Sequence, residues 1–299
     1  MDKSLLKPKY WGLWLGIGIA KLIVLLPYKF QMRLAIFIGK LAKPLAKKRN
    51  EIARINLNIA FPEKSEQEIK TLVNESYKSA CMAGFESLIA WFMPDRLFNK
   101  IHFDDSGLTT LIDTHRDPTK TLLSLGFHFH TLEIAGRYCG THFKPFSLMY
   151  QKHKHPVMEH IITTSRLKYV DKCFNRKNML SVIKNLKRKA TVWYAPDQDF
   201  REHSIFAPFF SKLCSTLTVT PWLAEKTNAT VIPIYYVRNK DLSGYKLISG
   251  DPLEFTGDAY KDAEMTNQFL EKAIRQYPEQ YLWQHRRYKT RPAGEEKIY

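Results

Sequence analysis

The chain lacks the signatures of several common protein classes. Its 299 residues contain four scattered cysteines, Cys81, Cys139, Cys173 and Cys214, and no CxxC pair. This spacing argues against a zinc site or a disulfide framework and is compatible with a reducing compartment. The sequence also has no glycine-rich phosphate loop, internal repeat or low-complexity tract, so it indicates neither a nucleotide cofactor nor a repeat architecture.

Acidic residues are scarce relative to basic ones. The chain has 46 Lys and Arg residues against 29 Asp and Glu residues, which gives a formal net charge of +17. Such a charge favours an acidic partner: nucleic acid, an anionic membrane surface, or an acidic protein or lipid. Hydrophobic residues make up 44% of the chain, so it can bury the core of an ordinary globular protein.

The N-terminal segment indicates contact with a membrane. Residues 11–26 are almost wholly apolar, but Lys21 interrupts them and Pro27 ends them. This stretch is short for a spanning helix, which needs about 20 apolar residues, so it either spans a bilayer or lies in its interface. No Ala-x-Ala cleavage site follows, and we expect no removed signal peptide.

The next segment, residues 30–49, is basic and amphipathic. Its apolar residues recur at helical spacing: Leu34, Phe37, Ile38, Leu41 and Leu45. Such a helix lies on an anionic membrane or docks on the body of a soluble protein. We therefore expect a membrane anchor over residues 1–50 and one main domain over residues 51–299. If residues 11–26 span the bilayer, the basic flank places the main domain on the cytoplasmic side.

The rest of the chain alternates helical and strand patterns. Ser65 and Glu68 form a capping-box pattern that opens a helix to about Trp91. Residues 104–120 are polar and predict a connector. The expected strands are 191–194, 230–236 and 245–249, and the expected helices are 156–167, 176–189, 218–226 and 262–276. This alternation predicts an α/β fold with a mixed, largely parallel sheet sandwiched by helices, and ligands bind at the carboxyl ends of such strands.

The most informative segment is an apolar run that begins at Leu123 and ends in His128, with Glu133 five positions further on. Residues five apart on one helix point about 140° away from each other. A strand that ends near His128 and a helix that begins near Thr131 can nevertheless bring the two side chains together. A base with an orienting carboxylate can activate a hydroxyl, and a helix N-terminus offers N–H groups to an oxyanion. His130 is an alternative partner for Glu133, and a structural role for the histidines is the other interpretation.

Other candidates follow the later strands. Asp197 and Asp199 come after the strand 191–194 and could bind a metal, orient a basic side chain or form a polar turn. Arg166 and Arg176 could anchor a carboxylate or phosphate. Residues 206–210 form an apolar, proline-containing loop that could line an acyl groove or close the core.

The C-terminal run 283–292 mixes aromatic and basic residues, among them Arg286 and Arg287. On its own this composition fits phosphate binding in nucleic acid or in lipid headgroups.

Taken in order, these segments resemble the late acyltransferases of lipid A biosynthesis, the lauroyl/myristoyl transferase family of Gram-negative bacteria. The histidine–acidic motif alone is shared with glycerolipid acyltransferases, which usually carry aspartate at the second position. The motifs that carry the resemblance cover nearly the whole chain: Pro8-Lys-Tyr-Trp11, Arg54-Ile-Asn56, Phe61-Pro62, Pro94-Asp95-Arg96, His128-Phe-His-Thr-Leu-Glu133, Trp193-Tyr-Ala-Pro-Asp197-Gln-Asp199 and His285-Arg-Arg-Tyr-Lys-Thr-Arg-Pro292.

The resemblance implies a glycerolipid-acyltransferase-like fold and an inner-membrane enzyme with its site on the cytoplasmic face. The enzyme would transfer a lauroyl-type acyl group from acyl carrier protein to a hydroxyacyl chain of a lipid A precursor that bears the sugar acid Kdo. His128 would be the general base, oriented by Glu133, and backbone N–H groups or Arg166 would stabilise the oxyanion. No metal, other cofactor or nucleic acid is implied. The rivals are a lysophospholipid acyltransferase with the same dyad and a non-enzymatic basic protein that binds membranes or nucleic acid.

Overall fold

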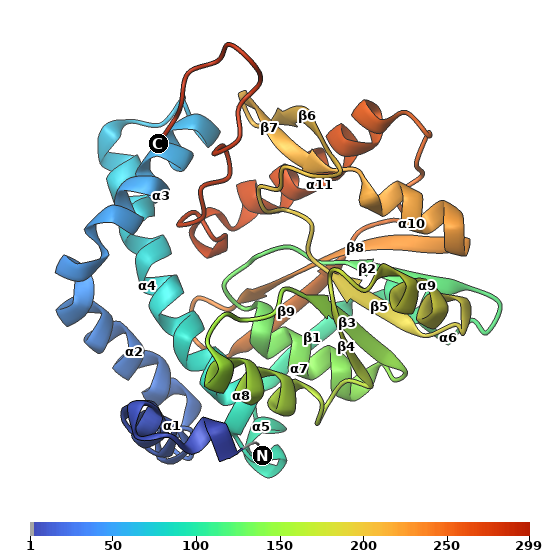
Figure 1. The fold of residues 1–299 in the computed structure, drawn as a ribbon. Coiled ribbons are helices and arrows are strands. Elements are labelled where there is room, and N and C mark those ends of the chain that lie inside the picture. Colours follow the sequence, from blue (N-terminus) through green and yellow to red (C-terminus); the bar gives the residue numbers. More distant parts are fainter. Residues whose placement is uncertain (1–2) are drawn as a thin grey trace.

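A twisted sheet forms the centre of the protein in the computed structural model, which describes residues 3–299 (Figure 1). Its strands are β1 (His102–Gly107), β2 (Thr121–Leu125), β3 (Phe146–Tyr150), β4 (Lys172–Asn175), β5 (Thr191–Tyr194), β8 (Ala229–Arg238) and β9 (Gly244–Ser249). The strand order is β1-β9-β8-β2-β5-β3-β4. Strands β8 and β9 are antiparallel, and every other neighbouring pair is parallel. The predicted α/β fold with a mixed, largely parallel sheet is confirmed.

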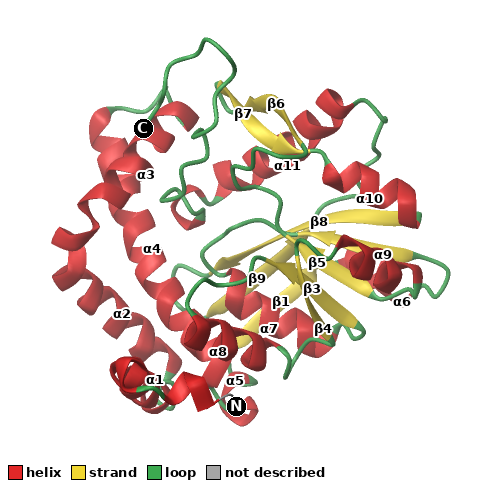
Figure 2. Cartoon of the chain, in the orientation of Figure 1, coloured by secondary structure: helices red, strands yellow, loops and turns green. Residues whose placement is uncertain are grey.

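Helices cover both faces of this sheet (Figure 2). In the main body they are α5 (Asp95–Phe98), α6 (Thr109–Arg116), α7 (Leu132–His142), α8 (Pro156–Arg166), α9 (Met179–Lys187), α10 (Val219–Thr227), α11 (Ala259–Gln276) and the 3₁₀ turn η4 (Pro278–Gln280). Parallel crossovers are right-handed. Because the chain reverses its direction across the sheet after β4, α7 and α8 lie on one face, and α9 and α10 lie on the other.

A layer of N-terminal helices packs against the side of this body (Figure 1). It consists of η1 (Lys3–Leu6), η2 (Pro8–Tyr10), α1 (Trp11–Ile23), α2 (Tyr28–Ala42), η3 (Lys43–Ala46), α3 (Lys47–Ala60) and the long α4 (Glu66–Phe92). The expected capping box is present, because Ser65 Oγ accepts from the Glu68 N–H while the Glu68 carboxylate accepts from the Ser65 N–H. Helix α4 thereby begins and ends within a residue of its expected bounds.

Three local predictions were wrong. Residues 104–120 form β1 and α6 rather than a connector, because the polar β1 is an edge strand that pairs only with β9. Residues 206–210 lie in the antiparallel hairpin of β6 (Ser204–Phe209) and β7 (Lys212–Leu217) rather than in a loop. The single amphipathic helix expected over 30–49 is broken into α2, η3 and α3 at Pro44, since proline lacks the N–H that a continuous helix requires. Strands β3 and β4 were not predicted.

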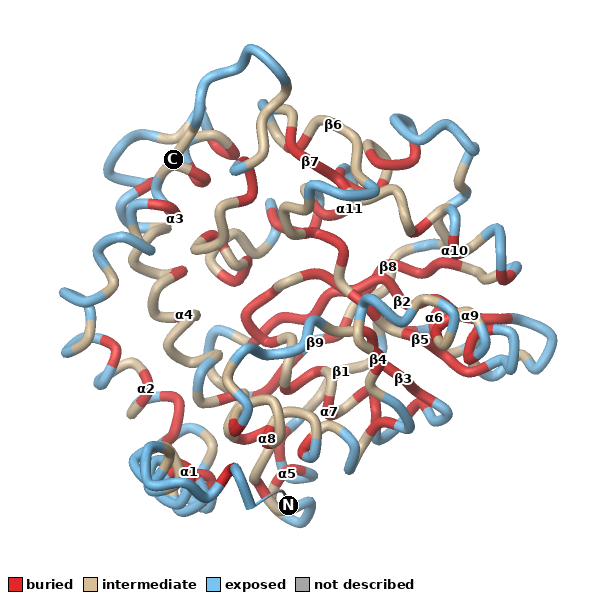
Figure 3. Tube along the Cα trace, viewed as in Figure 1, coloured by how far each residue is buried: buried red, intermediate tan, exposed pale blue. Residues whose placement is uncertain are grey.

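Burial separates the body from the N-terminal layer (Figure 3). The central strands are buried, whereas α1 and α2 expose large apolar side chains, including Trp11 at 64% and Leu41 at 69%. The other large exposed apolar residues of the N-terminal layer are Leu6, Leu15, Ile19, Leu22, Leu25, Leu26, Phe30, Phe37, Ile38 and Leu45. Within the described residues 3–299, none of the helices has both the length and the apolar character needed to cross a bilayer.

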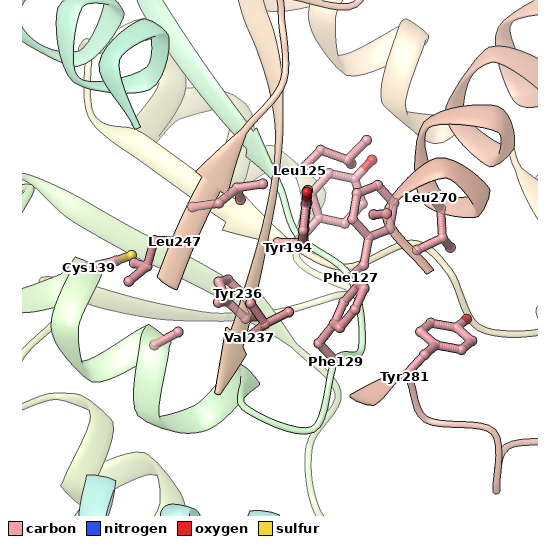
Figure 4. Packing of buried hydrophobic residues seen from close by; sticks show 14 of the residues in the cluster. Leu125, Phe127, Phe129, Cys139, Tyr194, Tyr236, Val237, Leu247, Leu270 and Tyr281 are labelled. Carbon is pink, nitrogen blue, oxygen red and sulfur yellow. The ribbon is translucent and has the colours of Figure 1, made fainter. Parts of the chain in front are cut away.

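The core carries aromatic side chains directly under the end of β2 (Figure 4). Phe127 stacks on Phe269, with ring centroids 5.7 Å apart, and Phe129 stacks on Tyr235 at 5.6 Å. Both phenylalanines are almost fully buried. The segment that follows β2 is therefore held in place on both sides of His128 by the packing of its neighbours.

A buried ion pair ties α4 to the sheet. The Arg238 Nε and Nη2 atoms each lie 2.6 Å from a carboxylate oxygen of Glu86, and both side chains are at most 3% exposed. Tyr245 donates to the same carboxylate at 2.6 Å, and Tyr28 of α2 donates to Tyr245 at 2.8 Å. The cluster connects the N-terminal layer to β8 and β9, and the sequence patterns gave no sign of it.

Candidate active site

His128 lies just beyond β2, paired with Asp197. The imidazole Nδ1 is 2.7 Å from Asp197 Oδ1, and the His128 backbone N–H donates to Asp197 Oδ2 at 3.0 Å. The Asp197 side chain is 2% exposed, whereas the His128 side chain is 27% exposed. The Nε2 atom of His128 makes no hydrogen bond within residues 3–299. The ring therefore has one nitrogen anchored to a buried carboxylate and the other open to an incoming group.

The register of two neighbouring strands explains this pairing. Strands β2 and β5 are parallel, and Leu125 lies opposite Tyr194. His128 and Asp197 each follow three residues after that pair, so they meet at the same edge of the sheet. The sequence patterns place both residues at carboxyl ends of strands, but only the adjacency of β2 and β5 brings them into contact.

The surroundings of Asp197 keep its carboxyl ionised. Burial alone would raise the pKa of Asp197. The charge of His128, the two hydrogen bonds from His128 and the charge of Arg287 outweigh burial and lower that pKa. The Tyr281 hydroxyl also donates to Asp197 Oδ2, at 3.1 Å. An ionised carboxylate at this position favours the tautomer with the proton on Nδ1 and stabilises an imidazolium when one forms.

Glu133 has different partners from those that its spacing suggested. It lies in the first turn of α7, where its carboxylate accepts from Arg166 Nε at 2.8 Å and Nη2 at 2.5 Å, and from Trp91 Nε1 at 2.7 Å. The expectation that Glu133 orients His128 was wrong about the partner, because Asp197 occupies that position. The first turn of α7 directs Glu133 toward α4 and α8 instead.

The Glu133–Arg166 pair is partly buried and mutually satisfied, with side chains 14% and 19% exposed. Burial would raise the pKa of Glu133, but the charge and hydrogen bonds of Arg166 and the bond from Trp91 lower it. Two of the three guanidinium nitrogens of Arg166 are engaged by Glu133. Glu133 thus orients the guanidinium of Arg166, which keeps three of its five N–H donors but makes no hydrogen bond to the His128–Asp197 pair.

His130 belongs to the interior rather than to the site. Its ring lies 2.9 Å from Ser79 Oγ and 3.4 Å from Gln284 Oε1. Burial and the nearby charge of Arg238 lower the pKa of His130 to about 3. The alternative pairing of His130 with Glu133 does not occur.

The remaining candidates take separate positions. Asp199 accepts from the N–H and hydroxyl of Thr290, which pins the C-terminal run to the loop after β5. Arg176 is exposed and stacks over Phe200 at 5.0 Å, and Arg286 stacks over Tyr299 at 5.7 Å. None of these three contacts the His128–Asp197 pair.

Arg287 is buried, with 2% exposure, and donates to the Ser215 carbonyl at 2.5 Å. An incoming phosphate could not reach a guanidinium in this position. Arg287 acts on the site through its charge, which contributes to the lowered pKa of Asp197. The structure thus favours a supporting role for Arg287 over a substrate contact.

A mainly apolar pocket adjoins the site. Its cavity volume is about 30 Å³, and it lies among α4, α7, the end of α8, and strands β3, β5 and β8. Glu133, Arg166, Trp91, Trp193 and Tyr236 line it among others. In residues 3–299, no group of three or more His, Cys, Asp or Glu side chains is placed to hold a metal ion.

Trp193 joins the pocket to the loop that carries His128. A Cβ atom at Gly126 would lie 2.3 Å from the Trp193 indole, so the ring packs flat against the backbone two residues before His128. Only glycine permits this approach. The indole forms part of the pocket wall as well.

Comparisons with known proteins identify the family of this chain. The family described as bacterial lipid A biosynthesis acyltransferase matches residues 1–290. A lipid A biosynthesis lauroyltransferase of Escherichia coli (strain K12) is 38% identical, over 97% of this chain and 95% of the relative. A lipid A biosynthesis palmitoleoyltransferase of the same organism is 37% identical, over 100% and 97%.

Among solved structures, a 1-acyl-sn-glycerophosphate acyltransferase from Thermotoga maritima aligns with a TM-score of 0.38 and 12% identity, over 84% of this chain and 98% of that one. That likeness is too weak to support an inference. The family match and the two Escherichia coli relatives span almost the full length of the chain, and they establish that it belongs to the lipid A biosynthesis acyltransferase family.

Proposed function

We propose that this acyltransferase moves a lauroyl-type fatty acyl group from acyl carrier protein to a hydroxyacyl chain of a Kdo-bearing lipid A precursor. Family membership and the lauroyltransferase relative support the reaction class. The +17 charge supports the substrates, because an acidic carrier protein and a phosphorylated lipid are both attracted to a basic surface. The observation that carries the chemistry is the partly exposed imidazole of His128, anchored through Nδ1 to the buried Asp197.

In the proposed step, His128 Nε2 removes the proton of the acceptor hydroxyl as its oxygen attacks the thioester carbonyl. Asp197 stabilises the imidazolium that forms. Collapse of the tetrahedral intermediate forms the ester and breaks the C–S bond, and the imidazolium returns its proton to the departing thiolate. Backbone N–H groups at the start of α7 stabilise the oxyanion, as helix N-termini do.

Glu133 is a positioning residue in this proposal. Its carboxylate joins α7 to Arg166 at the end of α8 and to Trp91 at the end of α4. These three elements contribute to the wall of the pocket, and Trp193 links that wall to the loop before His128. Glu133 thus holds the walls between which substrate must lie, while Asp197 acts on the base.

The membrane anchor is the second part of the proposal. The apolar side chains that α1 and α2 expose, with the lysines and arginines of residues 29–49, suit an anionic bilayer surface. We place residues 1–50 on the cytoplasmic face of a bacterial inner membrane, with residues 51–299 as the catalytic domain beside it. Residues 1 and 2 of that anchor lie outside the described residues.

A radiolabelled transfer assay tests the reaction. Acyl carrier protein loaded with labelled laurate is the donor, and Kdo-bearing lipid A precursor or lysophosphatidate is the acceptor. We expect product only with the lipid A precursor, and a loss of product in His128→Ala but not in the control His142→Ala, which removes an exposed histidine of α7. Transfer to lysophosphatidate alone would replace the proposal with a glycerolipid acyltransferase, and full activity in His128→Ala would end the proposed mechanism.

A further inference from the structure

Two glycines of α7 differ in what surrounds them. A Cβ atom at Gly140 would lie 2.7 Å from Val170 Cγ1, so close packing requires glycine there. A Cβ atom at Gly136 would meet no atom within 4 Å, although Gly136 is one of the residues that line the pocket. Glycine inside a helix is destabilising relative to alanine. Packing therefore does not explain glycine at position 136, and open space in the pocket does.

We infer that this pocket is a subsite for a hydrocarbon chain and that the missing side chain at Gly136 sets how much of the chain fits. The inference rests on the proposed function, which supplies a fatty acyl chain at His128. Most of the wall is apolar and includes Phe146, Leu148 and Val170. Three charged side chains line it: Glu133 and Arg166 neutralise each other, and Arg137 pairs with Asp95. A methylene chain therefore meets no unpaired charge.

The pocket is placed to receive a chain from the reacting carbonyl. Trp193 lies against Gly126, two residues before His128, and also lines the pocket. Glu133, in the first turn of α7, lines it as well, and Gly136 follows one turn further along the same helix. A chain that enters beside His128 and passes along α7 meets position 136 after Glu133.

One wall must yield to admit a chain. A cavity of about 30 Å³ has room for roughly two water molecules, far less than a long acyl chain. The α8 side is the candidate wall, because Val157 and Ile161 of α8 pack on Leu5 and Ile17 in an apolar cluster separate from the main core. Helix α8 thus rests on the N-terminal layer that exposes apolar side chains to its surroundings.

Chain-length profiles test the subsite. The variants are Gly136→Ala and Gly136→Leu, with Gly84→Leu as the control, because Gly84 is an exposed helical glycine of α4 that also faces open space. One series varies the acyl group on acyl carrier protein from about eight to sixteen carbons, and a second series varies the hydroxyacyl chain of the acceptor. Circular dichroism and thermal unfolding establish that each variant is folded.

We expect Gly136→Leu to lower kcat/KM for the longest chains about 10- to 100-fold while the shortest keep wild-type values, since each buried methylene contributes about a factor of four. Gly136→Ala shifts the profile less, and Gly84→Leu leaves it unchanged. A shift in the donor series assigns the pocket to the donor chain, and a shift only in the acceptor series assigns it to the acceptor chain. An equal change at every length in both series, or no change, overturns the inference.

A binding measurement separates this inference from the proposed reaction. Fatty acids of the same lengths are titrated against His128→Ala protein with and without Gly136→Leu, and retention is measured by equilibrium dialysis. In one outcome, the wild-type protein transfers no acyl group while fatty-acid binding still depends on chain length and on residue 136. That result would support the subsite and contradict the proposed function. If binding depends neither on the length of the fatty acid nor on residue 136, the proposed subsite is wrong, whatever the transfer assay shows.

Discussion

The His128–Asp197 pair and the Glu133–Arg166 pair each take one residue from the short segment 128–133, yet they are built in opposite ways: Asp197 follows strand β5, and Arg166 ends helix α8. In the first pair a buried carboxylate holds a partly exposed ring whose Nε2 atom makes no hydrogen bond within residues 3–299. In the second pair a partly buried carboxylate accepts two hydrogen bonds from a guanidinium that is always charged. An imidazole can accept a proton and release it again near neutral pH, whereas a guanidinium stays protonated. The difference assigns proton transfer to one pair and the support of the pocket walls to the other.

The largest expected effect concerns the first pair. His128→Ala and Asp197→Asn should each reduce the transfer rate about 10²–10⁴-fold, because one removes the general base and the other the charge that orients it. Thermal unfolding should change little in His128→Ala. The transfer assay gives the rate, and calorimetry gives the stability. Wild-type rates in Asp197→Asn would show that the buried carboxylate has no part in the reaction.

Changes to the Glu133–Arg166 pair should mainly lower the free energy of unfolding. Glu133→Ala leaves the partly buried Arg166 without its counter-ion, which we expect to cost about 3 kcal/mol of unfolding free energy. The double variant Glu133→Ala/Arg166→Met should recover part of that loss. Urea unfolding measures both. If Glu133→Ala instead abolishes transfer without lowering stability, the roles of the two carboxylates are the reverse of those argued above.

Trp193 contacts the loop before His128 and also lines the pocket beside Glu133. Gly126→Ala therefore tests how closely these two regions are coupled. The added methyl group would lie 2.3 Å from the indole, and the resulting strain should cost about 1–3 kcal/mol. Transfer should fall as well, because the loop with His128 must shift. Gly84→Ala is the matched control, since its methyl group enters open space. Equal unfolding curves for the two variants would contradict the close packing of Trp193 on Gly126.

A smaller effect comes from His130, two residues beyond His128. Its folded-state pKa of about 3 lies below the ordinary value of 6.5, so at intermediate pH the unfolded chain binds a proton that the folded chain excludes. Stability is therefore retained above about pH 6.5 and lost as the pH falls, by at most about 1.4 kcal/mol per pH unit. His130→Gln should flatten the pH dependence of urea unfolding between about pH 4 and 6.5. An unchanged slope would mean that His130 is not held neutral.

Much of the fold could be predicted from local patterns. The capping box at Ser65 and the apolar runs of β2, β5 and β8 follow from hydrogen bonding and hydrophobic periodicity, and each appears in the structure. The edge strand β1 could not be predicted this way, because its polar residues take strand geometry only through pairing with β9. The hairpin of β6 and β7 was not predicted, because Pro208 in β6 is a residue type that usually indicates a loop.

The site shows the same division. The sequence by itself determined that His128, Glu133 and Asp197 stand at the ends of buried strands or at the start of a helix, because strand and helix periodicity are local properties. Only the tertiary structure decided that His128 pairs with Asp197 and that Glu133 pairs with Arg166. The order of strands in a sheet depends on contacts between distant segments, and spacing along the chain carries no information about which strand becomes a neighbour.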